Sequence, residues 1–157
     1  MYPVMKYLIF MILLWTFAAC DSRVIFEDYH PVGNRGWHKD SAIVFTVNLQ
    51  DKRQSYNLYL NIRNKGNYPN SNIWLFVNIK SPEGKLLTDT VELVLADHSG
   101  KWRGSGIGDL FDNQFLYQQN LSFPVAGEYQ FSVRQGMRAT KLQGIQDVGI
   151  RLEKRHE

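Results

Sequence analysis

The chain has 157 residues, of which 44% are hydrophobic and 13% aromatic, so it contains enough apolar material for the core of one globular domain. Eighteen Lys and Arg stand against fifteen Asp and Glu, and without Lys6 of the leader the numbers are nearly equal. No basic stripe of the kind that nucleic-acid binding requires is present, and a single cysteine excludes an internal disulfide framework.

The first nineteen residues predict a signal peptide. Lys6 precedes an uncharged apolar stretch at 7–19, which is shorter than the roughly 20 residues of a membrane-spanning helix. Phe17-Ala18-Ala19-Cys20 resembles the lipobox of bacterial lipoproteins, in which small residues precede the modified cysteine. We expect cleavage before Cys20 and attachment of lipid, including a palmitate-like acyl chain, because two or more acyl chains anchor a protein stably. The alternative is a plain signal peptide, or an uncleaved anchor, with an incidental cysteine.

Residues 20–39 contain a proline and two glycines and predict a polar tether, with a short strand allowed at 23–27. Residues 40–157 predict one domain. Within it, apolar and polar residues alternate with the period of half-buried strands. These runs lie at 43–49, 56–62, 73–79, 91–95, 115–123, 129–133 and 148–152.

Turn-forming residues separate these runs, and Ser81-Pro82-Glu83-Gly84 is typical of a tight β-turn. No stretch after residue 20 carries a sustained apolar pattern at helical spacing. The sequence therefore predicts an all-β domain, a single antiparallel, jelly-roll-like sandwich of about seven or eight strands.

The irregular stretch 96–113 is long for a compact domain, and it is where we expect a surface site. This stretch contains Trp102, which we predict to contact a partner or ligand. We predict the same role for Trp37 and Arg138, which lie outside the stretch. Other aromatic residues on the less apolar strand faces either form a stacking platform or fill the core. For Trp74 and Phe76 we favour the core, because they share a strand with three aliphatic residues.

Patterns that would indicate catalysis or metal binding are weak. The histidines lack the spacing of metal ligands, and no serine lies in a G-x-S-x-G turn. Asp109, Asp112 and Asn113 could offer oxygen ligands to calcium, but acidic loop residues are common on exported sandwiches. A pair of carboxylates for glycoside hydrolysis stays open, because their separation cannot be read from sequence. We expect no enzyme, no resident metal and no cofactor besides the covalent lipid on Cys20.

Several segments in order resemble the GldH family of gliding-motility lipoproteins from Bacteroidota. They are Cys20-Asp21-Ser22, Gly36-Trp37-His38-Lys39-Asp40, 56–64, 68–75, Trp102-Arg103-Gly104-Ser105-Gly106, 123–129, Gln135-Gly136-Met137-Arg138 and 144–153. The resemblance implies a non-catalytic lipoprotein linked to gliding motility and the associated type IX secretion machinery. It implies other envelope proteins of that machinery as partners, no small-molecule substrate, and a lipid-anchored location that we expect to be the outer membrane.

Two other functions stay open at this point. A glycan-binding surface lipoprotein would use loop aromatics to stack on sugar rings. A hydrolase would depend on a carboxylate such as Asp109.

Overall fold

The computed structural model describes residues 23–155, so the expected signal peptide and Cys20 lie outside the described residues. Between these bounds the chain forms strands, turns and bends but no helix. Accordingly, no helix in this range is long and apolar enough to cross a membrane.

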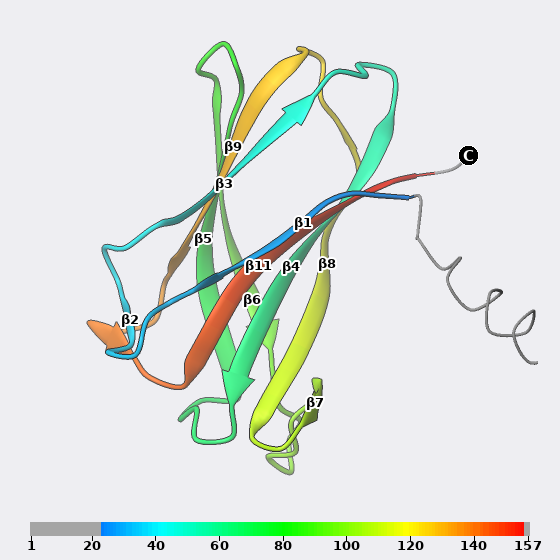
Figure 1. The fold of residues 1–157 in the computed structure, drawn as a ribbon. Helices are drawn as coiled ribbons and strands as arrows, with labels where there is room; N and C mark the ends of the chain where they lie inside the picture. Colours follow the sequence, from blue (N-terminus) through cyan, green and yellow to red (C-terminus); the bar gives the residue numbers. More distant parts are fainter. Residues whose placement is uncertain (1–22, 156–157) are drawn as a thin grey trace, which may run out of the picture.

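Two antiparallel sheets face each other in a sandwich (Figure 1). The five-stranded sheet contains, in spatial order, β1 (Val24–Pro31), β11 (Ile145–Lys154), β4 (Ser55–Lys65), β8 (Leu110–Ser122) and β7 (Ser105–Ile107). The four-stranded sheet contains β3 (Ile43–Leu49), β9 (Gly127–Gln135), β5 (Asn72–Lys80) and β6 (Leu86–Val94). A small ribbon pairs β2 (Trp37–His38) with β10 (Lys141–Leu142).

The eight long strands pair from the outside of the sequence inward. β1 pairs with β11, β3 with β9, β4 with β8, and β5 with β6, all antiparallel. This nested pairing is that of a long hairpin rolled into two sheets, which is the topology of a jelly roll. The predicted all-β, jelly-roll-like sandwich is therefore confirmed.

The core lies between the sheets and follows the alternation of the sequence. In β3 the buried side chains are Phe45, Val47 and Leu49, and the residues between them are exposed. The other strands contribute aliphatic residues and a cluster of aromatic rings, in which the centroids of Phe123 and Tyr129 lie 4.7 Å apart. The alternation predicted these strands because one face of each sheet is covered and the other is solvated.

The structure differs from the sequence prediction at the expected tether. Residues 24–31 form β1, which is longer than the short strand allowed there, and β2 follows at 37–38. The ordered domain therefore begins well before residue 40. The physical reason is a long-range one, since β1 covers the outer edge of β11, more than a hundred residues away in sequence.

The irregular stretch also differs from its prediction. Its second half forms the hairpin of β7 and β8, in which Gly106 lies opposite Phe111. A Cβ at Gly106 would come within 1.8 Å of the Leu110 carbonyl oxygen, so only glycine allows this approach. Gly106 thus allows the two strands to approach closely in a tight hairpin.

The sandwich has two ends that differ in what they carry (Figure 1). We call one the termini end, because β1 begins there and β11 finishes there. It also holds the connections at 50–54, 81–85 and 123–126. We call the other the far end; it holds the β2–β10 ribbon, the β7–β8 hairpin and the connections at 66–71, 95–104 and 136–140.

Candidate functional site

All three residues predicted as contacts lie at the far end, but they are not equally accessible. Trp37 is 1% exposed and belongs to the core. Its indole N–H donates to the Ser41 carbonyl oxygen at 2.9 Å, which satisfies the one polar group of the ring. The prediction of Trp37 as a surface contact is therefore wrong, because the ribbon of β2 and β10 turns the ring inward.

Trp102 is half-buried and packs against the core. Its ring centroid lies 6.3 Å from that of Tyr68 and 5.8 Å from that of Phe111. The backbone of Trp102 also forms an isolated bridge with Ala96, which ties the long loop to the end of β6. Much of the ring therefore packs against its neighbours and holds the loop in place. The rest of the ring is exposed to solvent.

Arg138 is exposed and lies in a groove of about 350 Å³ that the sequence analysis did not identify. We call it the Trp74 groove; Trp74, Asn70 and Asn72 form one side, and residues 136–139 with Leu142 form the other. Trp74 is 40% exposed, so its assignment to the core is wrong. It points away from the core because Ile73 and Leu75 on either side point into it, and within residues 23–155 no third layer covers this face.

The loop that carries Arg138 is held in place from below by Gln135, which is 1% exposed. Its side-chain amide donates to the Ala139 carbonyl oxygen at 2.8 Å and accepts from the Met137 N–H at 2.8 Å. The Gly136 N–H donates to the Trp74 carbonyl oxygen at 2.7 Å. The groove is therefore preformed, which lowers the entropy that a partner must remove on binding.

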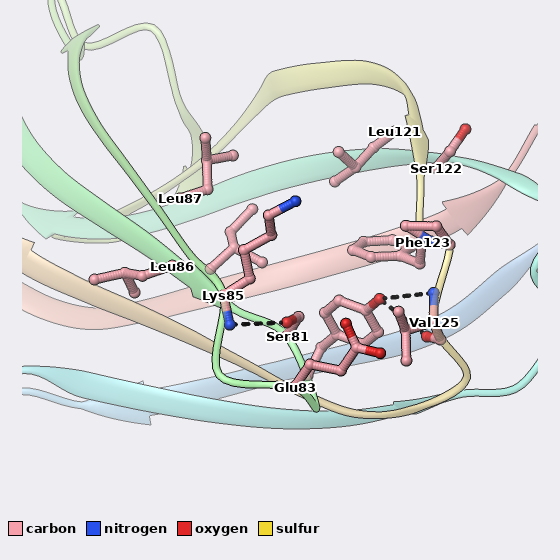
Figure 2. Close-up of a pocket in the computed structure, with 12 residues that line it drawn as sticks. Ser81, Glu83, Lys85, Leu86, Leu87, Leu121, Ser122, Phe123 and Val125 are labelled. Atoms are coloured by element: carbon pink, nitrogen blue, oxygen red, sulfur yellow. Dashed lines mark hydrogen bonds between the residues drawn. The ribbon is translucent and has the colours of Figure 1, made fainter.

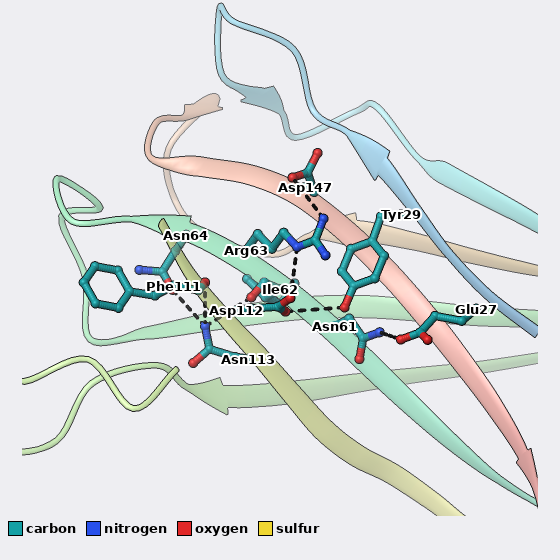
Figure 3. A network of polar contacts seen from close by, with 10 residues as sticks. All are labelled: Glu27, Tyr29, Asn61, Ile62, Arg63, Asn64, Phe111, Asp112, Asn113 and Asp147. Carbon is teal, nitrogen blue, oxygen red and sulfur yellow. Dashed lines mark hydrogen bonds and ion pairs between the residues drawn. The ribbon is translucent and has the colours of Figure 1, made fainter. Parts of the chain in front are cut away.

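A second polar feature covers the outer face of the five-stranded sheet (Figure 3). Arg63 donates to the Asp112 carboxylate at 3.0 Å, and its guanidinium lies 3.9 Å from Asp147 and 3.8 Å from the centroid of the Tyr29 ring. The Tyr29 hydroxyl donates to Asp112 at 3.4 Å. We call these four residues the outer-face network; they come from four neighbouring strands and join them across the sheet.

Within the outer-face network the acid and base groups contact one another, and Asp147 also lines a pocket with Lys65 and Asp109. Burial, helped by the Asp112 carboxylate, raises the pKa of Tyr29 to about 12, so its hydroxyl keeps its proton at neutral pH. A protonated phenol, a paired carboxylate and a paired guanidinium tie strands together. They do not form the free base or nucleophile that acyl or glycosyl transfer needs.

The residues considered for calcium do not converge. Asp112 is paired with Arg63, and the Asp109 carboxylate accepts from the Gly66 N–H at 3.0 Å. Asn113 points inward and donates to the side-chain oxygen of Asn64 at 2.9 Å (Figure 3). Among residues 23–155 no group of three or more His, Cys, Asp or Glu side chains is placed to hold a metal ion.

Comparison with known proteins gives a consistent result. The GldH lipoprotein family model matches residues 24–152. A gliding motility lipoprotein GldH homolog from Christiangramia forsetii is 36% identical over 153 residues, covering 93% of this chain and 93% of the relative. The gliding motility lipoprotein GldH of Flavobacterium johnsoniae is 34% identical over 144 residues, covering 87% and 89%.

Solved structures give only a distant likeness. A family GH115 4-O-methyl-α-glucuronidase with specificity for decorated arabinogalactans aligns with a TM-score of 0.45 and 10% identity. The alignment covers 87% of this chain but only 18% of that enzyme, so it carries no argument about function. The sequence relatives, in contrast, match over 87–93% of the chain, and the chain belongs to the GldH lipoprotein family of gliding-motility proteins.

Proposed function

We propose that this chain is a non-catalytic, lipid-anchored component of the envelope machinery for gliding motility and the associated type IX secretion. The observation that carries the proposal is the 34–36% identity, over nearly the full length, to proteins named gliding motility lipoproteins. Membership of a lipoprotein family indicates a membrane anchor. We assign the anchor to Cys20, the only cysteine of the chain, and the location to the outer membrane.

Two features of the fold support a binding role over a catalytic one. The charged side chains of the outer-face network are paired across the sheet, and the Trp74 groove is preformed and solvent-facing. Exposed Trp and Arg side chains are enriched among the residues that dominate protein–protein affinity. We assign Trp74 and Arg138 as contacts for another envelope protein of the same machinery.

The first experiment tests the anchor and the role together. A deletion strain is complemented with the wild-type chain or with Cys20→Ser, and spreading on agar and secretion are measured. We expect the wild type to restore both, and Cys20→Ser to restore neither although the protein is made. Restoration by Cys20→Ser would contradict the lipid anchor, and unaltered spreading and secretion in the deletion strain would contradict the motility role.

The second experiment tests the partner contact. The tagged chain is solubilised gently from membranes, and co-purifying envelope proteins are quantified for the wild type, Trp74→Ala and Leu116→Ala. Leu116 is a matched control, because it is 44% exposed but lies on the other sheet. Loss of an interface hot spot lowers affinity about tenfold or more, so recovery should collapse for Trp74→Ala and persist for Leu116→Ala. Equal recovery from both variants would exclude the groove.

A glycan-binding lipoprotein is the second candidate, and the observation that favours it is the exposed indole of Trp74 beside Arg138 and two asparagine amides. Indole rings stack on sugar faces, and amides and guanidinium groups donate to hydroxyls. In gel retardation across a panel of polysaccharides, this candidate predicts slowed migration that Trp74→Ala removes. Unretarded migration of the wild-type protein on every polysaccharide would eliminate it.

A further inference from the structure

The anchor assigned above lies very close to the folded domain. Three peptide units separate Cys20 from Arg23, the first described residue, and β1 begins at Val24. An extended chain spans at most about 3.6 Å per residue, so the Cα atoms of Cys20 and Arg23 lie within about 11 Å of each other. A lipid on Cys20 therefore holds the termini end, and not the far end, against the bilayer surface. The inference below rests on this anchor, which is part of the proposed function.

The strand register shows what else lies at the level of Arg23. The Lys154 N–H donates to the Arg23 carbonyl oxygen at 2.8 Å. Lys154 pairs with Tyr56 in β4, and Tyr56 pairs with Leu121 in β8. Neighbouring strands are about 4.8 Å apart, so Leu121 lies about 14 Å across the sheet from Arg23 and at the same level along the strands.

Leu121 forms part of the wall of a cavity of about 430 Å³ at this end of the molecule (Figure 2). The cavity lies between the β5–β6 turn and the β8–β9 connection. Its apolar lining includes Leu86, Leu87, Leu121, Phe123 and Val125. Leu86 is 60% exposed and Leu87 is 49% exposed, so two exposed leucines line the cavity at its β6 side.

Two of the hydroxyl groups that line the cavity already have partners. The Tyr129 hydroxyl donates to the Val125 carbonyl oxygen at 2.9 Å, and the Lys85 N–H donates to the Ser81 hydroxyl oxygen at 3.1 Å. The charged groups of Glu83 and Lys85 lie on the turn, where long side chains can reach water or lipid headgroups. The interior thus offers apolar contact with few free donors or acceptors, which suits hydrocarbon better than a polar ligand.

We propose that this cavity is a membrane-contact site that takes acyl chains of the bilayer in which Cys20 is anchored. The domain then touches the membrane at two places, the tether beside β1 and the Leu86–Leu87 mouth on the opposite edge of the same end. Two separated contacts fix the tilt of the sandwich, whereas a single short tether leaves it free to rotate. Since β11 has ten residues at about 3.3 Å each, the far end is held about 30 Å from the bilayer.

The test uses the full-length lipidated protein in phosphatidylethanolamine vesicles that contain a nitroxide-labelled phospholipid. Cys20 is the only cysteine, and its thiol is taken up by the lipid, so Leu86→Cys gives a single site for an environment-sensitive fluorophore. Two matched controls are exposed apolar residues elsewhere. Leu116→Cys replaces a residue that is 44% exposed on the outer face, and Ile107→Cys replaces one that is 95% exposed at the far end.

We expect the nitroxide lipid to quench the fluorophore at position 86 several-fold more than at positions 116 and 107, with a blue-shifted emission at position 86 alone. Equal quenching at all three positions would overturn the proposal, as would a blue shift at 86 that the bilayer quencher does not affect, because the occupant would then not be the bilayer. Flotation of the unlabelled protein with the vesicles distinguishes failure of the lipid anchor from failure of the contact site. A chain that does not float contradicts the anchor itself, whereas a chain that floats without quenching at 86 contradicts only the contact site.

Discussion

The two ends of the sandwich are built differently. At the termini end the chain makes three short connections: 50–54 and 123–126 cross between the sheets, and 81–85 is the turn of the β5–β6 hairpin within the four-stranded sheet. At the far end it makes longer excursions that contain two extra pieces of sheet, the β2–β10 ribbon and β7. The termini end carries an apolar cavity with exposed leucines, and the far end carries a preformed groove with an exposed tryptophan beside an arginine.

This difference shows how a jelly roll can make membrane contacts at one end and protein contacts at the other. Nested pairing brings the first and last strands side by side, so a lipid attached just before β1 selects one end of the roll for the membrane. With the anchor that we propose at Cys20, the opposite end, where the loops are long, faces away from the membrane, and it is the end that we propose to contact other proteins. Three substitutions at the far end and one in the outer-face network between the ends test this division, in order of decreasing effect.

The largest effect is expected at the buried tryptophan of the far end. Trp37→Ala removes a core ring that is 1% exposed, together with its hydrogen bond to Ser41. Truncating a buried aromatic residue typically lowers the free energy of unfolding by about 3–5 kcal/mol. Trp74→Ala is the matched control, for which we expect less than about 1 kcal/mol because its ring is exposed. Urea unfolding followed by circular dichroism measures both, and similar values for the two variants would contradict the division into core and groove.

Alkaline pH should loosen the far end through Tyr68. Burial raises the pKa of Tyr68 to about 12, and its hydroxyl donates to the Asn72 carbonyl oxygen at 2.9 Å. Below pH 10 the folded and unfolded chains both hold this proton, so its contribution is fully present; between pH 10 and 12 the unfolded chain loses the proton first and stability falls. The free energy of unfolding can fall by at most about 2.7 kcal/mol, which corresponds to a difference of two pKa units between the folded and unfolded chains. Stability measured from pH 9 to 12 should fall less steeply for Tyr68→Phe, and parallel curves would refute this assignment.

The groove should depend on the amide of Gln135. Gln135→Met keeps the volume but removes two half-buried hydrogen bonds, one from the Met137 N–H and one to the Ala139 carbonyl oxygen. We expect a loss of about 1–3 kcal/mol and a weakening of the partner contact made by Trp74. Hydrogen exchange of the 136–140 backbone reports the change directly. Unchanged protection there would show that the loop does not depend on this side chain.

The smallest effect is expected from the outer-face network between the two ends. Asp112→Asn weakens one ion pair with Arg63, in which both side chains are about one-third exposed. Pairs of this exposure contribute roughly 0–1 kcal/mol, and salt screens them. We expect a small loss at low salt that fades at high salt, with spreading of the cells unaffected. Loss of spreading without loss of stability would instead assign the network a functional role.

Much of the sandwich could be predicted from the sequence, because a strand with one covered face shows alternating apolar and polar residues in its own sequence. The run 43–49 is an example, since its buried and exposed residues match the prediction. β1 was harder, because a polar segment becomes a strand only through a partner more than a hundred residues away. The local sequence pattern does not show that a distant strand has an unpaired edge, such as that of β11. The strand β1 was therefore interpreted as part of a tether.

The candidate site was predicted only in part. A surface site was expected in the stretch 96–113, whereas the Trp74 groove is lined by residues of 70–74 and 136–142; of the residues predicted as contacts, Arg138 lies in it. Trp37 and Trp74 exchanged roles, because alternation within a strand cannot say whether its second face is covered by another layer. The sequence around Trp74 nevertheless indicated its position. Strict alternation in a strand places Trp74 on the face opposite to that of Ile73 and Leu75, and those two aliphatic residues are the ones expected in the core.

The most direct test of the account is crosslinking in living cells from the two ends of the same molecule. Single cysteines at positions 74 and 86 are labelled with a maleimide photo-crosslinker, and adducts of the lipidated chain are compared by mass. The account predicts protein adducts from position 74, drawn from the motility or secretion machinery, and lipid adducts from position 86. Protein adducts from position 86 with none from position 74 would contradict the division of the sandwich into a membrane end and a partner end.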